Sequence, residues 1–115
     1  VVFEENGVRF EVDVLRGHKT GFFLDQRDNR LRLRELSEGQ EVLDLFTYTG
    51  GFAVSAALGG AKRTVAVDQA EPAIRACCRN YELNGFTAEV VIGAAASAIS
   101  DATHHLYAAD CFDFL

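Results

Sequence analysis

The feature of this sequence that most constrains its fold is the alternation of strand-like and helix-like segments that begins at residue 41. Three short apolar runs have the length and composition of buried strands, at 41–46, 63–67 and 88–92. Between them, 52–58 and 72–84 predict helices, because Pro72 suits a first helical turn and Gly85 is a typical terminator. Strands that alternate with helices in this way predict an α/β fold with a doubly wound parallel sheet.

The last part of the chain continues this pattern less regularly. Residues 106–109 predict a further strand. Residues 93–105 are rich in Ala and Ser, and we expect an inserted loop or a short helix there. The stretch ends in His104 and His105, which we therefore expect in a loop. Together with His18 they have no metal-ligand spacing, so no metal site is predicted.

The first 24 residues predict a β-hairpin that precedes the α/β region. Residues 7–14 alternate apolar and charged side chains, which is the period of a half-buried strand. A turn at 16–18 then leads to 20–23 as the returning strand. We therefore divide the chain into a hairpin extension, 1–24, and an α/β part, 25–115.

A helix is expected directly after the hairpin, with Asp25 as its N-cap and with 37–40 as its end. Four arginines lie along it, at Arg27, Arg30, Arg32 and Arg34. They form either a basic face for RNA or an ordinary solvated helix surface. The whole chain has a net charge of −6, so charge alone does not predict a general nucleic-acid binder.

The cysteines and the hydropathy pattern bear on the cell compartment. Cys77, Cys78 and Cys111 lack CxxC spacing, which favours reduced thiols, and we expect the adjacent pair to pack as small apolar groups in a helix. The sequence has no apolar run of about 18 residues, as a membrane span would need, and no signal-peptide pattern. We therefore expect a cytoplasmic protein without a membrane partner.

Acidic residues lie at the ends of three of the predicted strands. Asp44 begins the loop DLFTYTGG at 44–51, Asp68 follows the second strand, and Asp110 follows the strand at 106–109. Ligands of open parallel sheets bind beyond the carboxyl ends of the strands, so these residues predict a binding crevice. Taken singly, each aspartate could equally cap a helix. The loop has neither the GxGxxG pattern nor a P-loop, which favours a nucleoside ligand without phosphates, such as S-adenosylmethionine (SAM).

Several segments together resemble a known family. They read GHKTGFFLDQRDNR (17–30), VLDLFTYTGGFAVSAALGGA (42–61), VAVDQAEPAI (65–74), NYELNGF (80–86) and ADCFDFL (109–115). In these segments the chain is similar to the bacterial SAM-dependent methyltransferases that form 5-methylcytosine in 23S ribosomal RNA. The resemblance implies a class I, Rossmann-like methyltransferase fold, of which 25–115 would be the SAM-binding half with an incomplete parallel sheet.

The resemblance also implies which residues bind SAM. Asp44, Phe46 and the loop 48–51 would surround the methionine part, Asp68 the ribose, and Asp110 with Cys111 the adenine. Residues on the N-terminal side would close the pocket. The complete set is Lys19, Gly21, Phe22, Gln26, Arg27, Asp44, Phe46, Tyr48, Thr49, Gly50, Gly51, Asp68, Asp110 and Cys111.

The same resemblance implies that the catalytic residues follow residue 115 and that the ribosomal RNA is bound mostly by regions outside this chain. By its position, Cys111 is not the nucleophile. The sequence leaves open whether the protein forms an oligomer. Three alternatives remain at this point: a guanine-N7 methyltransferase relative, which shares a similar FLD-x-R string; a nicotinamide-binding domain; and a non-catalytic binding remnant.

Overall fold

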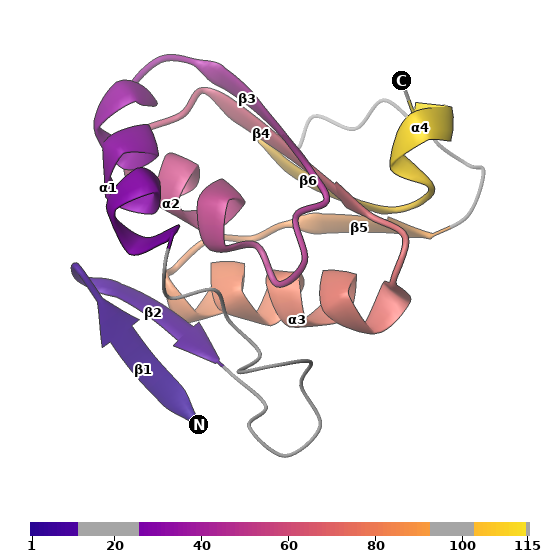
Figure 1. The fold of residues 1–115 in the computed structure, drawn as a ribbon, viewed down its shortest axis with the longest axis horizontal. Helices are drawn as coiled ribbons and strands as arrows, with labels where there is room; N and C mark the ends of the chain where they lie inside the picture. Colours follow the sequence, from indigo (N-terminus) through magenta and orange to yellow (C-terminus); the bar gives the residue numbers. More distant parts are fainter. Residues whose placement is uncertain (12–25, 93–102, 115) are drawn as a thin grey trace.

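The computed structural model describes residues 1–11, 26–92 and 103–114. These residues form a two-stranded hairpin, a four-stranded sheet and four helices (Figure 1). Several predictions lie outside the described residues and are not tested: the strand at 20–23, the Asp25 cap, most of the stretch 93–105, and the site residues Lys19, Gly21 and Phe22.

The central sheet confirms the α/β prediction. Its strands are β3 (Glu41–Leu45), β4 (Arg63–Asp68), β5 (Glu89–Ile92) and β6 (His104–Ala108). All three pairings are parallel, and the spatial order is β3-β4-β6-β5, so the last strand in the chain lies between β4 and β5. Because Asp68 pairs with Ala108, the strands end at one common rim of the sheet.

The predicted position of the two histidines was wrong. His104 and His105 are the first residues of β6 and are buried, rather than lying in a loop. Nδ1 of His104 lies 2.7 Å from Oγ1 of Thr64, which is also 2.7 Å from the Tyr81 hydroxyl. Burial of a polar imidazole is acceptable here because these hydrogen bonds replace those of water.

A hairpin is present, and one of its two strands was not predicted. β1 (Val2–Glu5) pairs antiparallel with β2 (Val8–Glu11), so a strand that precedes the alternating segment pairs with it. Asn6 and Gly7 form the turn with φ angles of 51° and 81°. Both central residues of a type I′ turn need positive φ, and Asn-Gly is the sequence that best supplies it. This dipeptide is a local sequence signal for the turn, and it was not among the predicted turns.

Helix α1 (Arg27–Leu36) lies where it was predicted, but its arginines do not form a free basic face. Arg30 is buried and makes a two-pronged ion pair with Glu5 of the hairpin, at 2.7 and 2.8 Å. Arg34 donates to the carbonyl of Asn6, and Arg27 donates to the Asn6 side chain at 3.4 Å. Three arginines spaced i, i+3 and i+7 therefore face the hairpin, because that spacing places them on one side of a helix.

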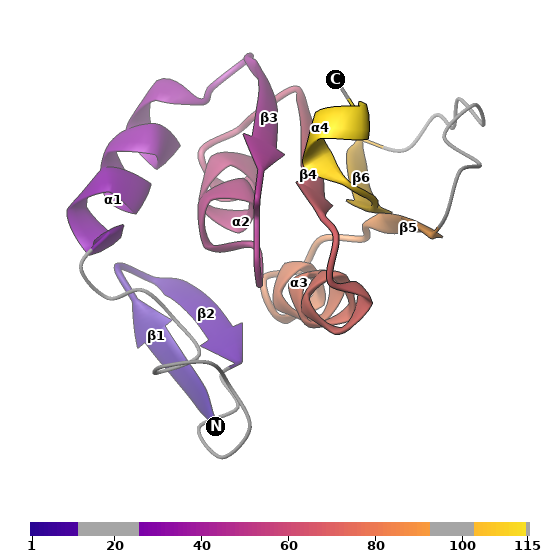
Figure 2. The ribbon, with the colours of Figure 1, turned by 45° about the vertical axis from the view of Figure 1, so that its right-hand side comes forward.

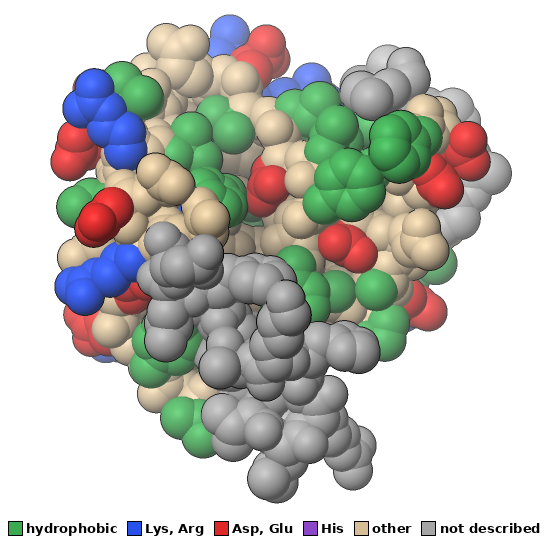
Figure 3. Space-filling view, in the orientation of Figure 1, with side chains coloured by type: hydrophobic (Ala, Val, Ile, Leu, Met, Phe, Trp, Pro, Cys, Tyr) green, Lys and Arg blue, Asp and Glu red, His purple; other side chains and the backbone are tan. Residues whose placement is uncertain are grey.

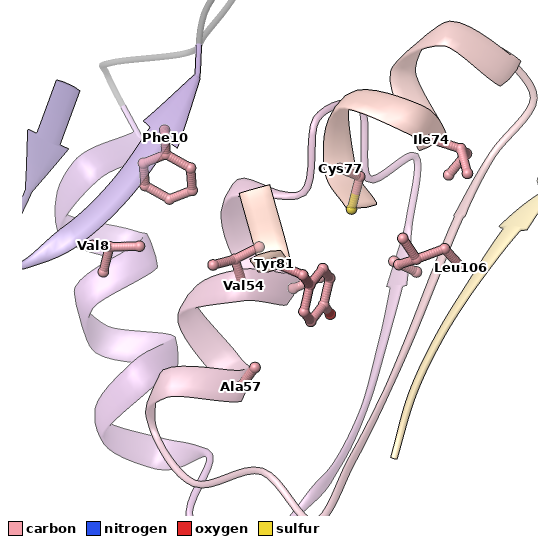
Figure 4. Packing of buried hydrophobic residues seen from close by; sticks show 10 residues of the cluster. Val8, Phe10, Val54, Ala57, Ile74, Cys77, Tyr81 and Leu106 are labelled. Carbon is pink, nitrogen blue, oxygen red and sulfur yellow. The ribbon is translucent and has the colours of Figure 1, made fainter. Parts of the chain in front are cut away.

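One face of the sheet carries most of the core. It is covered by α2 (Gly51–Leu58) and α3 (Glu71–Leu83), against which the hairpin packs. Figure 4 shows Val8 and Phe10 of β2, Val54 of α2 and Tyr81 of α3 converging on one cluster. Cys77 is buried in that cluster and Cys78 packs partly against it, as predicted.

The opposite face is covered by α4 (Cys111–Phe114) alone among the described helices (Figure 2). A smaller cluster of Val67, Tyr107 and Cys111 lies beneath it, with Phe114 packed against them. β3 is an edge strand of the described sheet, and Leu43 is 49% exposed. The prediction of a fully buried strand at 41–46 was therefore wrong for this part of the chain. Among the described residues, no helix is both long and apolar enough to cross a membrane.

Candidate cofactor-binding site

Asp44 is the second-last residue of β3, and the segment that follows the strand fixes its side chain. Its Oδ2 accepts hydrogen bonds from the hydroxyl of Thr47 at 2.6 Å and from the backbone N–H of Ala53, in the first turn of α2, at 3.2 Å. Burial raises the pKa of this carboxyl, the two hydrogen bonds oppose the rise, and the nearby charge of Asp68 adds to it. Asp44 and Asp68 are thus close enough to interact electrostatically.

The backbone of the same loop is unusual. Phe46 and Tyr48 have φ angles of 58° and 54°, and Gly50 has 87°. Residues other than glycine seldom adopt this left-handed conformation, and it is commonest where a site holds the backbone in place. At Gly50 a Cβ atom would collide with Sγ of Cys77 on α3, so only glycine fits there.

Asp68 connects the end of β4 to this loop. Its Oδ2 accepts the N–H of Tyr48 and its Oδ1 accepts the N–H of Ala70, both at 3.0 Å. A carboxylate has about four acceptor positions, so these bonds leave capacity for the two hydroxyls of a ribose. The residue is half-buried at the common rim, where a ligand can reach it.

Asp110 and Cys111 close the third side of the rim. Oδ1 of Asp110 accepts the N–H groups of Phe112 at 2.8 Å and Asp113 at 3.3 Å, so this aspartate caps α4. The buried Sγ of Cys111 accepts the N–H of Phe46 at 3.3 Å and donates to the carbonyl of Val67 at 3.6 Å. Asp110 is therefore connected to the loop that follows β3 through its neighbour Cys111.

An exposed aromatic pair bridges the same two segments. Phe46 and Phe112 are 62% and 77% exposed, and their rings meet edge to face with centroids 5.7 Å apart. Figure 3 shows hydrophobic and acidic side chains side by side over the region between β3 and α4. Such a surface suits the apolar face of an adenine ring next to groups that accept its amino hydrogens.

A cavity of about 90 Å³ lies beside the loop. Its lining residues are Gln26, Arg30, Phe46, Thr47, Tyr48, Thr49, Gly51 and Phe52. Five of these belong to the predicted site, whereas Arg30, Thr47 and Phe52 were missed. The three aspartates are not among these lining residues; the described contacts join them to the loop instead. Arg27, also predicted for the site, points its guanidinium at the hairpin turn.

Two residues missed by sequence reasoning, Thr47 and Asn80, hold the loop from behind. Thr47 bonds Asp44, Arg30 ties α1 to the hairpin, and the buried Asn80 donates to the carbonyl of Thr49 at 2.8 Å. A helical spacing of three arginines could have indicated that Arg30 faces a partner. No local signal marks Asn80, because its partners are 31 and 69 residues away.

The donor set fits SAM. Carboxylates with unused acceptor positions suit ribose hydroxyls and the adenine amine, and an acidic rim suits the positive charges of the sulfonium and the amino group. Among the described residues, no group of three or more His, Cys, Asp or Glu side chains lies close enough together to hold a metal ion.

Comparisons with known proteins agree with this geometry. The family model described as S-adenosylmethionine-dependent methyltransferase matches residues 2–102. A Vibrio cholerae protein named ribosomal RNA large subunit methyltransferase I is 52% identical over 86 residues, which is 75% of this chain and 22% of that protein. A Deinococcus radiodurans protein named ribosomal RNA large subunit methyltransferase is 52% identical over 84 residues, or 73% of this chain and 21% of its own length.

A solved structure matches over nearly the whole chain. The methyltransferase SMU.776, solved with SAH, superposes with a TM-score of 0.80 and 35% identity, covering 99% of this chain and 27% of that one. The chain thus spans about a fifth of the length of the curated relatives that it matches. The family match removes the nicotinamide-binding alternative. With its parallel sheet, its strand-end acids and its match to the family model, the chain belongs to the S-adenosylmethionine-dependent methyltransferases.

Proposed function

We propose that the chain is the SAM-binding part of an enzyme that methylates C5 of a cytosine in 23S ribosomal RNA. The observation that carries the proposal is the 52% identity, over three quarters of the chain, to proteins named ribosomal RNA large subunit methyltransferase I. The same chain also has the acidic residues at the strand ends and the loop after Asp44 that are described above. In this proposal the substrate is an RNA of the ribosome, and the protein acts in the cytoplasm.

In this proposal each strand end binds one part of the cofactor. Asp68 accepts the ribose hydroxyls, and Asp110 accepts the adenine amino group while the backbone at Cys111 contacts the ring. Asp44, Phe46 and residues 48–51 surround the methionine part, and Gln26 contributes from the start of α1. Lys19, Gly21 and Phe22 complete the pocket. SAM, when bound, supplies the electrophilic methyl group.

The described cysteines do not serve as the nucleophile that C5 methylation of cytosine requires. Burial raises the pKa of the Cys77 thiol well above its ordinary value, which keeps it protonated. Cys111 is buried and hydrogen-bonded at the rim. Cys78 is half-buried on α3, where burial and Glu82 raise its pKa. In the proposal, the nucleophile belongs to another part of the protein.

The RNA is bound mainly by other regions in this proposal. Three arginines of α1 are bonded to the hairpin, and the remaining one, Arg32, lies 3.6 Å from Glu35 on the surface. A phosphate backbone needs accessible cationic groups, while this chain carries a net charge of −6.

Nucleoside mass spectrometry tests the proposal. The whole enzyme that contains this chain is purified, supplied with SAM and incubated with 23S rRNA from cells that lack the modification, and the digested RNA is analysed. We expect 5-methylcytidine, and we expect the Asp68→Ala variant to form much less of it. Formation of 7-methylguanosine instead would move the assignment to the guanine-N7 relatives. Methylation of neither base in 23S rRNA, by protein that binds SAM, would refute the RNA assignment.

A further inference from the structure

Asn80 joins two segments that are far apart in the sequence. It lies on α3, is completely buried, and uses both ends of its side-chain amide. Its Oδ1 accepts the backbone N–H of Glu11 in β2, and its Nδ2 donates to the backbone carbonyl of Thr49, both at 2.8 Å. The hairpin and the Asp44 loop are therefore held at a fixed separation by one side chain.

The carbonyl that Asn80 binds is in the middle of the strained part of the loop. Thr49 lies between Tyr48 and Gly50, both of which have positive φ. The N–H of Tyr48 is held by Asp68, and Gly50 packs against Cys77, one helical turn before Asn80. A left-handed residue persists only where its surroundings determine its conformation. Asn80 supplies such a constraint on the side of the loop that faces α3.

Asn84 provides a comparison within the same helix. It caps the end of α3, about one turn beyond Asn80, and binds β2 in a similar way: Oδ1 accepts the N–H of Arg9 at 2.9 Å, and Nδ2 donates to the carbonyl of Arg9 at 2.7 Å. Its other described bond, to the carbonyl of Asn80, stays within α3. Asn84 thus docks the hairpin, whereas Asn80 docks the hairpin and also holds the loop.

The chemistry at position 80 is specific for an amide. One end must accept an N–H and the other must donate to a carbonyl, and only Asn provides both on a side chain of this length. An ionised aspartate has the same shape but cannot donate, so its second oxygen would face the carbonyl of Thr49. Serine is too short to reach both partners.

We propose that Asn80 is a positioning residue that sets the loop for SAM, a role that rests on the proposed assignment of this loop to the cofactor. In the proposed role, Asn80 does not contact the ligand. It acts through the carbonyl of Thr49, and so fixes the backbone at 48–50 that faces the cofactor.

The test compares Asn80→Asp with the matched control Asn84→Asp in the purified protein. Calorimetry measures SAH affinity at a temperature well below the melting temperature of every variant. We expect Asn80→Asp to weaken SAH binding about 10-fold or more and to shift the backbone NMR signals of Thr49 and Gly50. We expect Asn84→Asp to lower the melting temperature while SAH affinity stays within about 2-fold.

The second variant, Asn80→Ser, carries the test if Asn80→Asp does not fold, because a hydroxyl leaves no charge in the core. Folded Asn80 variants that bind SAH as tightly as Asn84→Asp would overturn the inference. The outcome is separable from the proposed function: wild-type protein that binds SAH but methylates another substrate leaves the role of Asn80 intact. Conversely, 5-methylcytidine formation with unaltered SAH affinity in both variants refutes only the role of Asn80.

Discussion

Left-handed backbone conformations occur at both ends of the parallel strands, but different kinds of residue adopt them. In the connections that lead into β3, β4 and β5, the left-handed residues are Gly39, Gly60 and Gly85. In the loop that leaves β3, they are Phe46, Tyr48 and Gly50. Glycine adopts this conformation without steric cost, while an aromatic residue pays about 1–2 kcal/mol for it. The amino ends are thus relaxed and the carboxyl end of β3 is strained.

The hydrogen bonds at the two ends of the strands also differ. At the amino ends, Thr64, Tyr81 and His104 form a buried hydrogen-bond network. At the carboxyl ends, Asp68 and Asp110 bind backbone N–H groups with only part of their acceptor capacity. The comparison indicates that one end stabilises the fold and the other is organised around a ligand. The following four predictions test that division.

The largest effect is expected for Gly50→Ala. A Cβ at this position collides with Cys77, and the backbone is left-handed, so we expect a loss of about 3 kcal/mol or more in stability together with loss of SAH binding. Gly39→Ala is the matched control, because its φ is 71° but its Cβ meets nothing within 4 Å. That variant should lose about 1–2 kcal/mol and keep its affinity. Equal losses in urea unfolding would show that the rim packing is unimportant.

Asp68→Ala should weaken SAM binding by roughly 10–100-fold, since each factor of ten corresponds to about 1.4 kcal/mol. In the proposed binding mode the variant loses the acceptor for the ribose, and it also loses the bond to Tyr48. Isothermal calorimetry provides the measurement, and Glu71→Ala serves as control because Glu71 is an exposed acid paired with Arg75. Unchanged SAM affinity in Asp68→Ala would remove this residue from the site.

Asp44→Asn should change stability and affinity in opposite directions. Burial raises the pKa of Asp44, so the folded state binds a proton more tightly than the unfolded chain, and the ionised form costs stability at neutral pH. The amide oxygen can still accept the N–H of Ala53. We expect a gain of about 0.5 kcal/mol or more and weaker SAH binding. Thermal unfolding with and without SAH measures both, and a variant with lower stability at neutral pH would contradict the reasoning.

The smallest effect concerns pH at the amino ends. Burial, with a contribution from His105, lowers the pKa of His104 below its usual 6.5. The unfolded chain therefore binds the proton more readily, so stability is complete above about pH 6.5 and declines as the pH falls through the folded-state pKa. Urea unfolding between pH 7.5 and 5 should show a shallower pH dependence for His104→Asn than for the wild type. An identical slope would show that His104 does not contribute.

Much of the local structure could be predicted from the sequence. The helix at 72–84 was expected within a residue of its observed end, because Pro72 and Gly85 mark its limits through their own backbone chemistry. The three aspartates were identified because parallel strands share one rim. The pairing of β1 with β2 was missed, although Asn6-Gly7 is a local signal. The burial of His104 was also missed, because its partners Thr64 and Tyr81 lie far away in the sequence.

The sequence by itself determined which segments become strands and helices, and where acids follow strands, because side-chain periodicity and turn chemistry act over a few residues. Only the tertiary structure decided that β6 lies between β4 and β5, that Arg30 serves the hairpin, and that Asn80 holds the loop. These outcomes depend on which distant groups can satisfy buried hydrogen bonds, and a burial partner many residues away leaves no periodic trace in the chain.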